Sequence, residues 1–246
     1  MEKDSYDVEA KVETFHWWFF VRRRLLKRLL HSLDLPQEFS AVDIGCGTGS
    51  NLRILGSVGI DNVVGLDRSL YALSLAKKKV NLPFVRGDIN NLPIRSNSVG
   101  LIIALDVLEH IDNDLNAIRE LYQVLRKEGI LILTVPAFNF LWGIQDVVTG
   151  HKRRYSKKGI MEKLKEERFA ILKSSYFNFF LFFPILFARR MIHLLGLKIA
   201  SENEINSPLI NFFFKAIFSM EVYVLKYFSF PFGVSIFCIA KKRDDG

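Results

Sequence analysis

The feature of this sequence that most restricts its fold is a run of three glycines at alternate positions, Val42-Asp43-Ile44-Gly45-Cys46-Gly47-Thr48-Gly49. The run follows a short apolar segment and precedes a helix-length segment, which predicts a tight turn between a strand and a helix. Glycine permits positive φ and lets the main chain approach a ligand closely. We therefore expect a small molecule to bind at the carboxyl end of this strand.

Short apolar and β-branched runs alternate with helix-length segments along most of the chain. The strands are predicted at 41–45, 62–66, 83–86, 99–105, 129–135, 169–174 and 234–240, and the helices at 16–33, 50–57, 70–79, 114–125 and 156–167. This alternation is typical of βαβ units. We expect a Rossmann-like, doubly wound α/β fold, with a mostly parallel seven-stranded sheet and helices on both of its faces.

Phenylalanine divides the chain into an ordinary globular part and an apolar C-terminal part. The sequence has 22 Phe, and more than half of them fall between Phe177 and Phe237. We predict an N-terminal lid helix in residues 1–35 and a ligand-binding core in residues 36–175. A Phe-rich helical insertion is predicted in residues 176–231, followed by the final strand and tail in residues 232–246.

The Phe-rich insertion contains two apolar stretches, at 179–188 and 208–228, and neither has 18 uninterrupted apolar residues. A transmembrane helix is therefore not expected. In the second stretch, Asn211, Lys215, Ser219 and Lys226 fall within about 80° of one another on a helix and form a narrow polar stripe. Three interpretations remain open: helices that cap the sheet, an apolar tunnel for an acceptor, or helices that dock on a membrane surface.

The chain is basic, with a formal net charge of +8, and its positive residues cluster at 22–28, 77–79 and 152–158. Such clusters attract phosphates on nucleic acid or on anionic lipid, although solvated helix faces produce the same pattern. Cys46 and Cys238 lie far apart in sequence, which favours a reducing, cytoplasmic compartment over a disulfide framework. The charged N-terminal segment does not have the composition of a signal peptide.

Acidic residues follow the second, third and fourth predicted strands. Asp67 can accept from both hydroxyls of a ribose, and Asp88 from an adenine amino group while Ile89 packs on the ring. Asp43, inside the end of the first strand, can face an ammonium group. Its position and the Gly-x-Gly-x-Gly spacing argue against a dinucleotide, whose usual motif is Gly-x-Gly-x-x-Gly.

These motifs, together with Asp106-Val107-Leu108-Glu109-His110, closely resemble the class I S-adenosylmethionine-dependent methyltransferases over about residues 15–175. The resemblance is to the type-11 group, which includes ubiquinone and menaquinone biosynthesis methyltransferases, and it implies S-adenosylmethionine as the cofactor. It places Asp43, Gly45, Cys46, Gly47 and Gly49 around the methionine part, Asp67 on the ribose, Arg68, Asp88 and Ile89 around the adenine, Leu105 near the sulfonium, and Arg22 of the lid helix on the carboxylate.

The catalytic residues are less constrained, because the sulfonium is already activated and the protein need only align the acceptor. A base is required where the acceptor is a hydroxyl of high pKa. We predict His110, His151 and Asp106 as catalytic, with a loop-shaping role as the alternative for His110. The substrate-binding residues are predicted to be Arg153 and Arg154, whose guanidinium groups suit phosphate or carboxylate, together with Tyr155 and Trp142.

A metal is not expected. Asp106, Glu109 and His110 would make a plausible ligand set for a divalent ion. Relatives that carry a similar string, however, include both metal binders and proteins without a metal.

Together these features predict an enzyme that methylates a hydrophobic or lipid- or polyprenyl-linked small molecule on oxygen or carbon. Its expected partners are this acceptor and an anionic membrane surface, with the protein cytoplasmic and peripheral at the inner face of the membrane. Nucleic acid is not expected, since aliphatic and Phe surface interleaves with the basic clusters. The alternatives are an RNA-binding methyltransferase and a cofactor-binding protein without catalysis.

Overall fold

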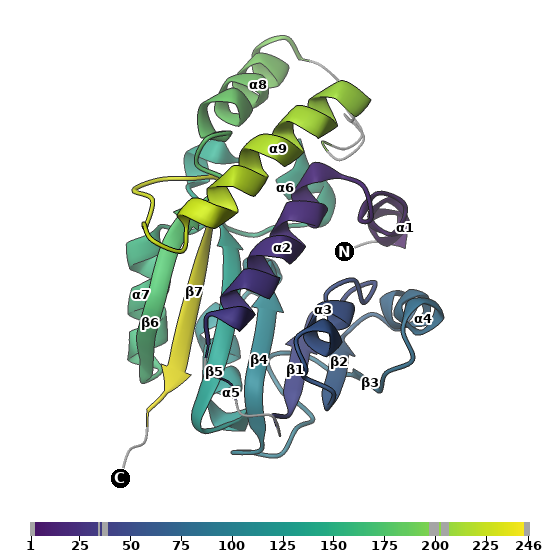
Figure 1. Cartoon of the computed structure of the whole chain (residues 1–246), viewed down its shortest axis with the longest axis vertical. Helices are drawn as coiled ribbons and strands as arrows, with labels where there is room; N and C mark the ends of the chain where they lie inside the picture. Colours follow the sequence, from purple (N-terminus) through teal and green to yellow (C-terminus); the bar gives the residue numbers. More distant parts are fainter. Residues whose placement is uncertain (1–2, 34, 36–38, 197–201, 203–206, 244–246) are drawn as a thin grey trace.

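The computed structural model describes residues 3–33, 35, 39–196, 202 and 207–243. Its centre is a seven-stranded sheet in the order β3-β2-β1-β4-β5-β7-β6 (Figure 1). The strands are β1 (Ala41–Ile44), β2 (Val63–Asp67), β3 (Phe84–Arg86), β4 (Val99–Leu105), β5 (Leu125–Pro136), β6 (Phe169–Phe177) and β7 (Ser235–Lys242). Strand β7 is antiparallel to both of its neighbours, β5 and β6, and the other neighbouring strands of this sheet are parallel to each other. The expected mostly parallel seven-stranded sheet is confirmed.

The central strands are buried along their whole length because both faces of the sheet are covered. Every residue of β1 and β4 is buried, which is typical of a parallel sheet between two helical layers. The order of strands reverses at the β1–β4 pair, and an open α/β sheet binds ligands at such a switch point. The glycine turn after β1 lies at this point.

The helices are α1 (Lys3–Val12), α2 (Trp17–His31), α3 (Leu52–Ser57), α4 (Leu70–Lys79), α5 (Asp114–Val124), α6 (Ile144–Thr149), α7 (Lys157–Glu166), α8 (Phe182–Leu194) and α9 (Pro208–Val224). In Figure 1, α2 and α9 cross in front of the sheet, and α5 and α7 lie behind it. Two short 3-10 helices, Leu108–His110 and Asn139–Leu141, follow β4 and β5. The five predicted helices are all confirmed, within a few residues at their ends.

Two helices, α1 and α6, were not predicted from the sequence. Tyr6 is the one buried residue of α1 and Asp146 the one buried residue of α6, so neither helix carries an apolar stripe. Short helices of this kind depend on tertiary contacts for their stability. The prediction also began β5 four residues too late, at Gly129, because β5 starts at Leu125, which pairs with Val99 of β4.

The Phe-rich insertion forms α8 and α9, and α9 lies along α2. The three residues of the polar stripe that lie within α9 (Asn211, Lys215 and Ser219) face α2. The Asn211 side chain accepts from the Trp17 amide at 2.6 Å and donates to the Phe15 carbonyl at 3.0 Å. The Lys215 ammonium lies 3.6 Å from the centroid of the Phe20 ring. The few polar groups of α9 are therefore largely used within the protein.

The opposite sides of α8 and α9 are apolar and exposed, and we call them the outer face. The face consists of Phe183, Phe187, Leu194, Leu209, Phe212, Phe213 and Met220, each at least half exposed. Lys226, two residues after the end of α9, and Arg190 of α8 are exposed basic residues close in sequence to these apolar side chains. Within the described ranges, no helix is both long and apolar enough to cross a membrane.

Candidate functional site

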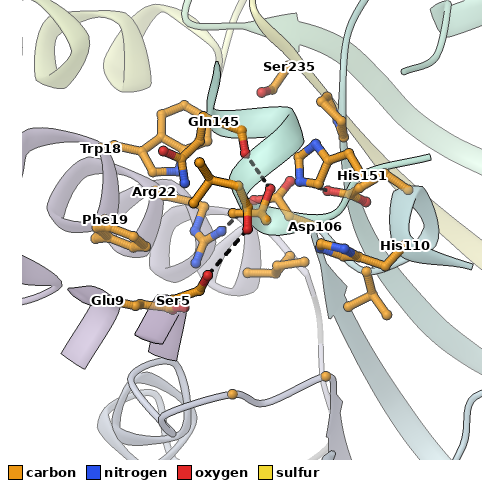
Figure 2. Close-up of a pocket in the computed structure, with 18 of the residues that line it drawn as sticks. Ser5, Glu9, Trp18, Phe19, Arg22, Asp106, His110, Gln145, His151 and Ser235 are labelled. Atoms are coloured by element: carbon orange, nitrogen blue, oxygen red, sulfur yellow. Dashed lines mark hydrogen bonds and ion pairs between the residues drawn. The ribbon is translucent and has the colours of Figure 1, made fainter. Parts of the chain in front are cut away.

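A cavity of about 940 Å³ lies beyond the carboxyl ends of β1, β2 and β4. Residues of α1, α2, the glycine turn, α6 and α8 line it, so segments from most of the chain meet there. Figure 2 shows Glu9, Phe19 and Arg22 on one side of this cavity and His110 and His151 on the other. The predicted position of the ligand site at the switch point agrees with this cavity.

The glycine turn forms one wall, and all three of its glycines, including Gly49 with φ of 80°, have backbone conformations that favour glycine. Gly45 has φ of 69° and Gly47 has φ of 51°. A Cβ on Gly45 would lie 2.6 Å from Cγ2 of Val107, whereas a Cβ on Gly47 would meet nothing within 4 Å. Gly45 therefore allows close packing against the loop after β4, and Gly47 leaves its side of the turn open to the cavity.

Asp67, at the end of β2, holds the glycine turn in place. One carboxylate oxygen accepts from the Gly47 amide at 2.9 Å and the other from the Ser69 amide at 2.8 Å. Burial raises the pKa of Asp67, and these two hydrogen bonds oppose that effect. A carboxylate has about four lone-pair sites, so Asp67 can still accept from two hydroxyls of a ligand.

The other predicted cofactor residues mostly line the same cavity: Arg68, Asp88, Ile89, Leu105 and Cys46. Asp88 is exposed and accepts from the Asn90 amide at 2.9 Å through one oxygen, while the neighbouring Ile89 is buried. A free carboxylate oxygen beside an apolar surface suits the amino edge and the face of a purine.

Asp43 and Gly49 are not among the lining residues. Asp43 is only 1% exposed, and its Oδ2 has no hydrogen-bond partner among the described residues. Burial raises the pKa of Asp43 to about 7, although the charge of Arg22 opposes this. A Cβ on Gly49 would lie 3.0 Å from Cβ of Ala76, so Gly49 allows the turn to pack against α4.

Arg22 of α2 reaches across the cavity to Asp106 at the end of β4 and forms an ion pair with it (Figure 2). The other Asp106 oxygen accepts from the Thr134 hydroxyl at 2.9 Å. Asp106 has φ of 56°, an uncommon value for a residue other than glycine. The Arg22 guanidinium, predicted to bind the cofactor carboxylate, therefore already has a carboxylate partner in the protein.

Helix α1 covers the cavity beside the glycine turn, a contribution that the sequence did not reveal. Just after α1, the Glu13 carboxylate accepts from the Thr48 hydroxyl of the turn and pairs with the Lys79 ammonium of α4. The Tyr71 hydroxyl donates to Asp7 at 2.5 Å. In the sequence, the α1 segment shows scattered acidic residues and no apolar periodicity. This pattern does not distinguish a helix that packs on the protein from a helix exposed to solvent.

Two histidines and a glutamate meet at the other end of the cavity. The Nδ1 atom of His151 lies 2.7 Å from an Asp146 carboxylate oxygen, and its Nε2 lies 3.8 Å from Oε1 of Glu109. The ring centroids of His110 and His151 are 4.7 Å apart. Burial, with the nearby His151, lowers the pKa of His110 to about 4. Burial also raises the pKa of Glu109, which has no exposed surface.

Asp146, which was not predicted as a site residue, organises this end of the cavity from α6. Besides contacting His151, it accepts from Arg154 Nε at 2.8 Å and from Arg154 Nη2 at 3.0 Å. Burial alone would raise the pKa of Asp146, but the His151 and Arg154 interactions outweigh it and hold the pKa below its usual value. Arg154 lines the cavity, yet its guanidinium is committed to Asp146 and to the Ala137 carbonyl.

Three predicted acceptor residues lie outside the lining of the cavity. Arg153 donates to the Asp112 carbonyl at 2.8 Å, and the buried Tyr155 hydroxyl donates to Asp114 at 2.9 Å. Trp142 is 41% exposed. Their placement gives no support to a contact with an acceptor in this cavity.

An apolar region of the same cavity is formed where α2, α8 and α9 contribute to the lining. Trp18, Ile185, Ile192, Phe214 and Val234 line it. The Trp18 ring packs against both Phe177 and Phe218, each at a centroid distance of 5.8 Å, and these two rings are 6.1 Å from each other. The cluster fixes α2 against the Phe-rich insertion. This region can accommodate an apolar group in the cavity that also contains the two histidines.

The strand order, the antiparallel β7 and the glycine turn at the switch point define the fold of the class I S-adenosylmethionine-dependent methyltransferases. A chain in the complex between the Haloferax volcanii Trm112 methyltransferase activator and a putative methyltransferase has the same fold. Its TM-score is 0.66 at 18% sequence identity, over 99% of this chain and 96% of that chain.

Sequence comparison relates part of the chain to a known family. Residues 42–133 match the family described as a methyltransferase domain, and this match supports S-adenosylmethionine as the cofactor. It is 31% identical over 163 residues to an uncharacterised protein of Methanocaldococcus jannaschii, covering 63% of this chain and 62% of that protein.

A second relative is a ubiquinone/menaquinone biosynthesis C-methyltransferase of Campylobacter jejuni, 28% identical over 136 residues. This match covers 52% of the chain and 57% of the relative. The chain thus spans about three-fifths of the length of these two curated relatives.

Proposed function

We propose that this protein transfers a methyl group from S-adenosylmethionine to a hydrophobic or lipid-linked small molecule, on oxygen or on carbon. The observation that carries the proposal is that one cavity joins the cofactor motifs to a histidine end and an apolar region. A cofactor held at the glycine turn would direct its sulfonium toward the end of β4. An acceptor in the other half of the cavity would then lie beside it.

In this proposal the glycine turn holds the methionine part of the cofactor and Asp67 accepts from its ribose. Asp88 and Ile89 hold the adenine, and the backbone at Leu105 lies next to the sulfonium. The cavity lining supports these positions for Gly45, Gly47, Asp67, Asp88, Ile89 and Leu105. Asp43 is buried and does not line the cavity, so any attraction between its carboxylate and the cofactor ammonium would act through the glycine turn.

Catalysis in this site depends mainly on alignment, because the sulfonium needs no further activation. His110 and His151 are the side chains that we place next to the reactive atom of the acceptor, since both line the cavity beyond the end of β4. Asp106 is tied to Arg22 and Thr134, so we assign it the role of positioning α2 over the site.

The apolar region and a quinone-pathway relative both favour a hydrophobic acceptor. The Campylobacter jejuni protein carries ubiquinone and menaquinone biosynthesis in its name, and quinones of this kind are apolar. The lining by Trp18, Ile185, Ile192 and Phe214 would hold the apolar part of such a molecule.

We further propose that the outer face of α8 and α9 docks on the cytoplasmic surface of an anionic membrane. A surface helix usually turns its polar stripe to water, whereas α9 turns its stripe to α2 and leaves Phe212, Phe213 and Met220 exposed. Exposed Arg190 and Lys226 provide positive charge, which anionic headgroups attract. Docking would place the cavity near a lipid-dissolved acceptor.

The cofactor assignment is tested by calorimetric titration with S-adenosylmethionine and its demethylated product. Asp67→Asn should weaken both affinities at least about tenfold, since a charge-assisted hydrogen bond is worth about 1.5–3 kcal/mol. The exposed Asp61→Asn is the matched control and should bind like the wild type. An unmodified protein that binds neither compound at millimolar concentration would overturn the proposal.

The acceptor class is tested with S-adenosylmethionine labelled on its methyl group and bacterial membrane-lipid extract as the source of acceptors. We expect label to enter an organic-soluble product. Label transferred to RNA instead would favour the RNA-binding methyltransferase, and tight cofactor binding with no product from either source would favour a protein without catalysis.

The membrane contact is tested by sedimentation with vesicles of phosphatidylglycerol and of phosphatidylcholine. The pair Phe212→Ser and Phe213→Ser should reduce binding to phosphatidylglycerol vesicles. Leu172→Ser, a similarly exposed apolar residue on β6, is the control and should leave binding unchanged. Equal binding by the double variant would contradict the docking surface.

A further inference from the structure

Glu109 is the most unusual side chain in the cavity wall. It has no exposed surface, and both of its carboxylate oxygens lack a hydrogen-bond partner among the residues that the structure describes. A buried polar group without a partner costs about 1–3 kcal/mol, and more when it is charged. The fold therefore keeps a carboxylate where the protein alone does not satisfy it.

The two histidines beside Glu109 each have one ring nitrogen committed elsewhere. His151 donates through Nδ1 to the Asp146 carboxylate at 2.7 Å, and the ring of His110 donates to the Gly150 carbonyl. Each ring therefore has its other nitrogen as a lone-pair acceptor. An imidazole held by a carboxylate or a carbonyl in this way is the usual arrangement of a metal-binding histidine, because the outer partner sets the tautomer and the ring orientation.

The free atoms of these residues converge. One ligand atom from each of Glu109, His110 and His151 lies within 4.8 Å of the others, and His151 Nε2 is 3.8 Å from Glu109 Oε1. A tetrahedral ion with ligands at about 2.1 Å holds them about 3.4 Å apart, so a closing movement of about 1 Å would complete the set. The hydrogen bond from the Lys152 amide to the Glu109 carbonyl, at 2.7 Å, joins the two loops that carry the ligands.

The geometry points to a binding site for a divalent transition-metal ion, with Glu109, His110 and His151 as its protein ligands. Two imidazoles and one carboxylate suit Zn²⁺ and neighbouring ions better than Mg²⁺, which prefers oxygen ligands. This set replaces the one considered from the sequence, because Asp106 is engaged by Arg22 and Thr134, whereas His151 comes from a distant loop.

Three protein ligands leave a coordination position that faces the cavity. On the proposed function, this position would take an oxygen of the acceptor and lower the pKa of a hydroxyl there, which favours methylation on oxygen. Only this role toward the acceptor rests on the proposed function. Binding of the ion does not, because it can be measured without an acceptor.

The test is titration of the tag-free, chelator-treated full chain with Zn²⁺, together with the visible absorption of its Co²⁺ form. We expect one Zn²⁺ per chain, a rise in Tm on binding, and Co²⁺ bands of a low-coordinate site. Glu109→Gln and His151→Gln should each weaken Zn²⁺ binding at least about tenfold and abolish the rise in Tm. His31→Gln, which removes an exposed histidine at the end of α2, should bind like the wild type.

Titration of each variant with the demethylated cofactor product separates this inference from the proposed function. Glu109→Gln should keep its affinity for that compound within about threefold, which also shows that the variant is folded. Wild-type affinity for Zn²⁺ in Glu109→Gln, or no binding by the wild type, would overturn the metal site. Failure of the unmodified chain to bind the demethylated product would instead overturn the proposed function.

Discussion

The guanidinium of Arg22 on α2 is ion-paired with the carboxylate of Asp106 at the end of β4, 84 positions away in sequence. The Arg22 side chain is 10% exposed and that of Asp106 is 20% exposed. This pair connects the helix over the cavity to the strand end beneath it.

Arg22→Met should lower the free energy of unfolding by about 3 kcal/mol, because it leaves the Asp106 carboxylate buried without its partner. Asp106→Asn in the same chain should recover part of the loss, giving a coupling energy above about 1 kcal/mol in a double-mutant cycle measured by urea unfolding. The exposed Lys27→Met on the same helix should change stability by less than about 0.5 kcal/mol. If the effects of the two substitutions on the free energy of unfolding are additive, the ion pair between Arg22 and Asp106 does not contribute to stability.

Gly45 and Gly47, two of the three glycines of the turn, should differ in their tolerance of alanine. Both have positive φ, which costs a substituted residue about 1–2 kcal/mol, but only Gly45 would also place a Cβ against Val107. We expect Gly47→Ala to weaken binding of the demethylated cofactor product by about tenfold or less, and Gly45→Ala to weaken it at least tenfold more. Calorimetric titration checks this order, and equal affinities would show that the contact with Val107 does not matter.

Arg154→Lys should destabilise the protein although it keeps the charge. Arg154 donates to both Asp146 oxygens and to the Ala137 carbonyl, and a lysine ammonium does not match this forked geometry. We expect a loss of about 2–3 kcal/mol in urea unfolding, in the range for a broken buried network. The neighbouring Arg153→Lys is the control, and its side chain is 32% exposed. Similar stability in the two variants would refute a structural role for Arg154.

His16 should make stability depend on pH. Burial lowers its pKa from 6.5 to about 4, so the unfolded chain binds more protons than the native protein between these values. The free energy of unfolding should therefore rise with pH from about 4 to 6.5, and this contribution is lost as the pH falls through the window. The rise should approach a slope of about 1.4 kcal/mol per pH unit in the middle of this window.

The variant His16→Asn isolates this effect. His16 Nδ1 accepts from the Trp18 amide at 3.3 Å as the N-cap of α2, and asparagine is a good N-cap as well. Urea unfolding at several pH values should show a smaller slope between pH 4 and 6.5 in the variant. An unchanged slope would assign the pH dependence to other groups.

The site residues that could be predicted from the sequence are those whose positions depend on nearby residues in the chain. Gly45, Gly47, Asp67 and Asp88 each follow a strand within a few residues, so the pattern of strands suffices to bring them to one edge of the sheet. The contacts of Arg22, Asp146 and Arg154 could not be predicted in this way. Arginine and aspartate pairs of this kind form between loops or between a helix and a strand, and nothing in the local sequence distinguishes a buried guanidinium from an exposed one.

The sequence by itself determined the order of strands and helices and the glycine turn, because apolar periodicity and backbone preferences act over a few residues. The direction in which α9 turns its polar stripe was decided only by tertiary structure, since α2 provides the partners of Asn211 and Lys215. The same holds for the meeting of His151 with Glu109 and His110, which two loops bring together. Both depend on packing between distant segments, where the free energy comes from contacts that no single segment contains.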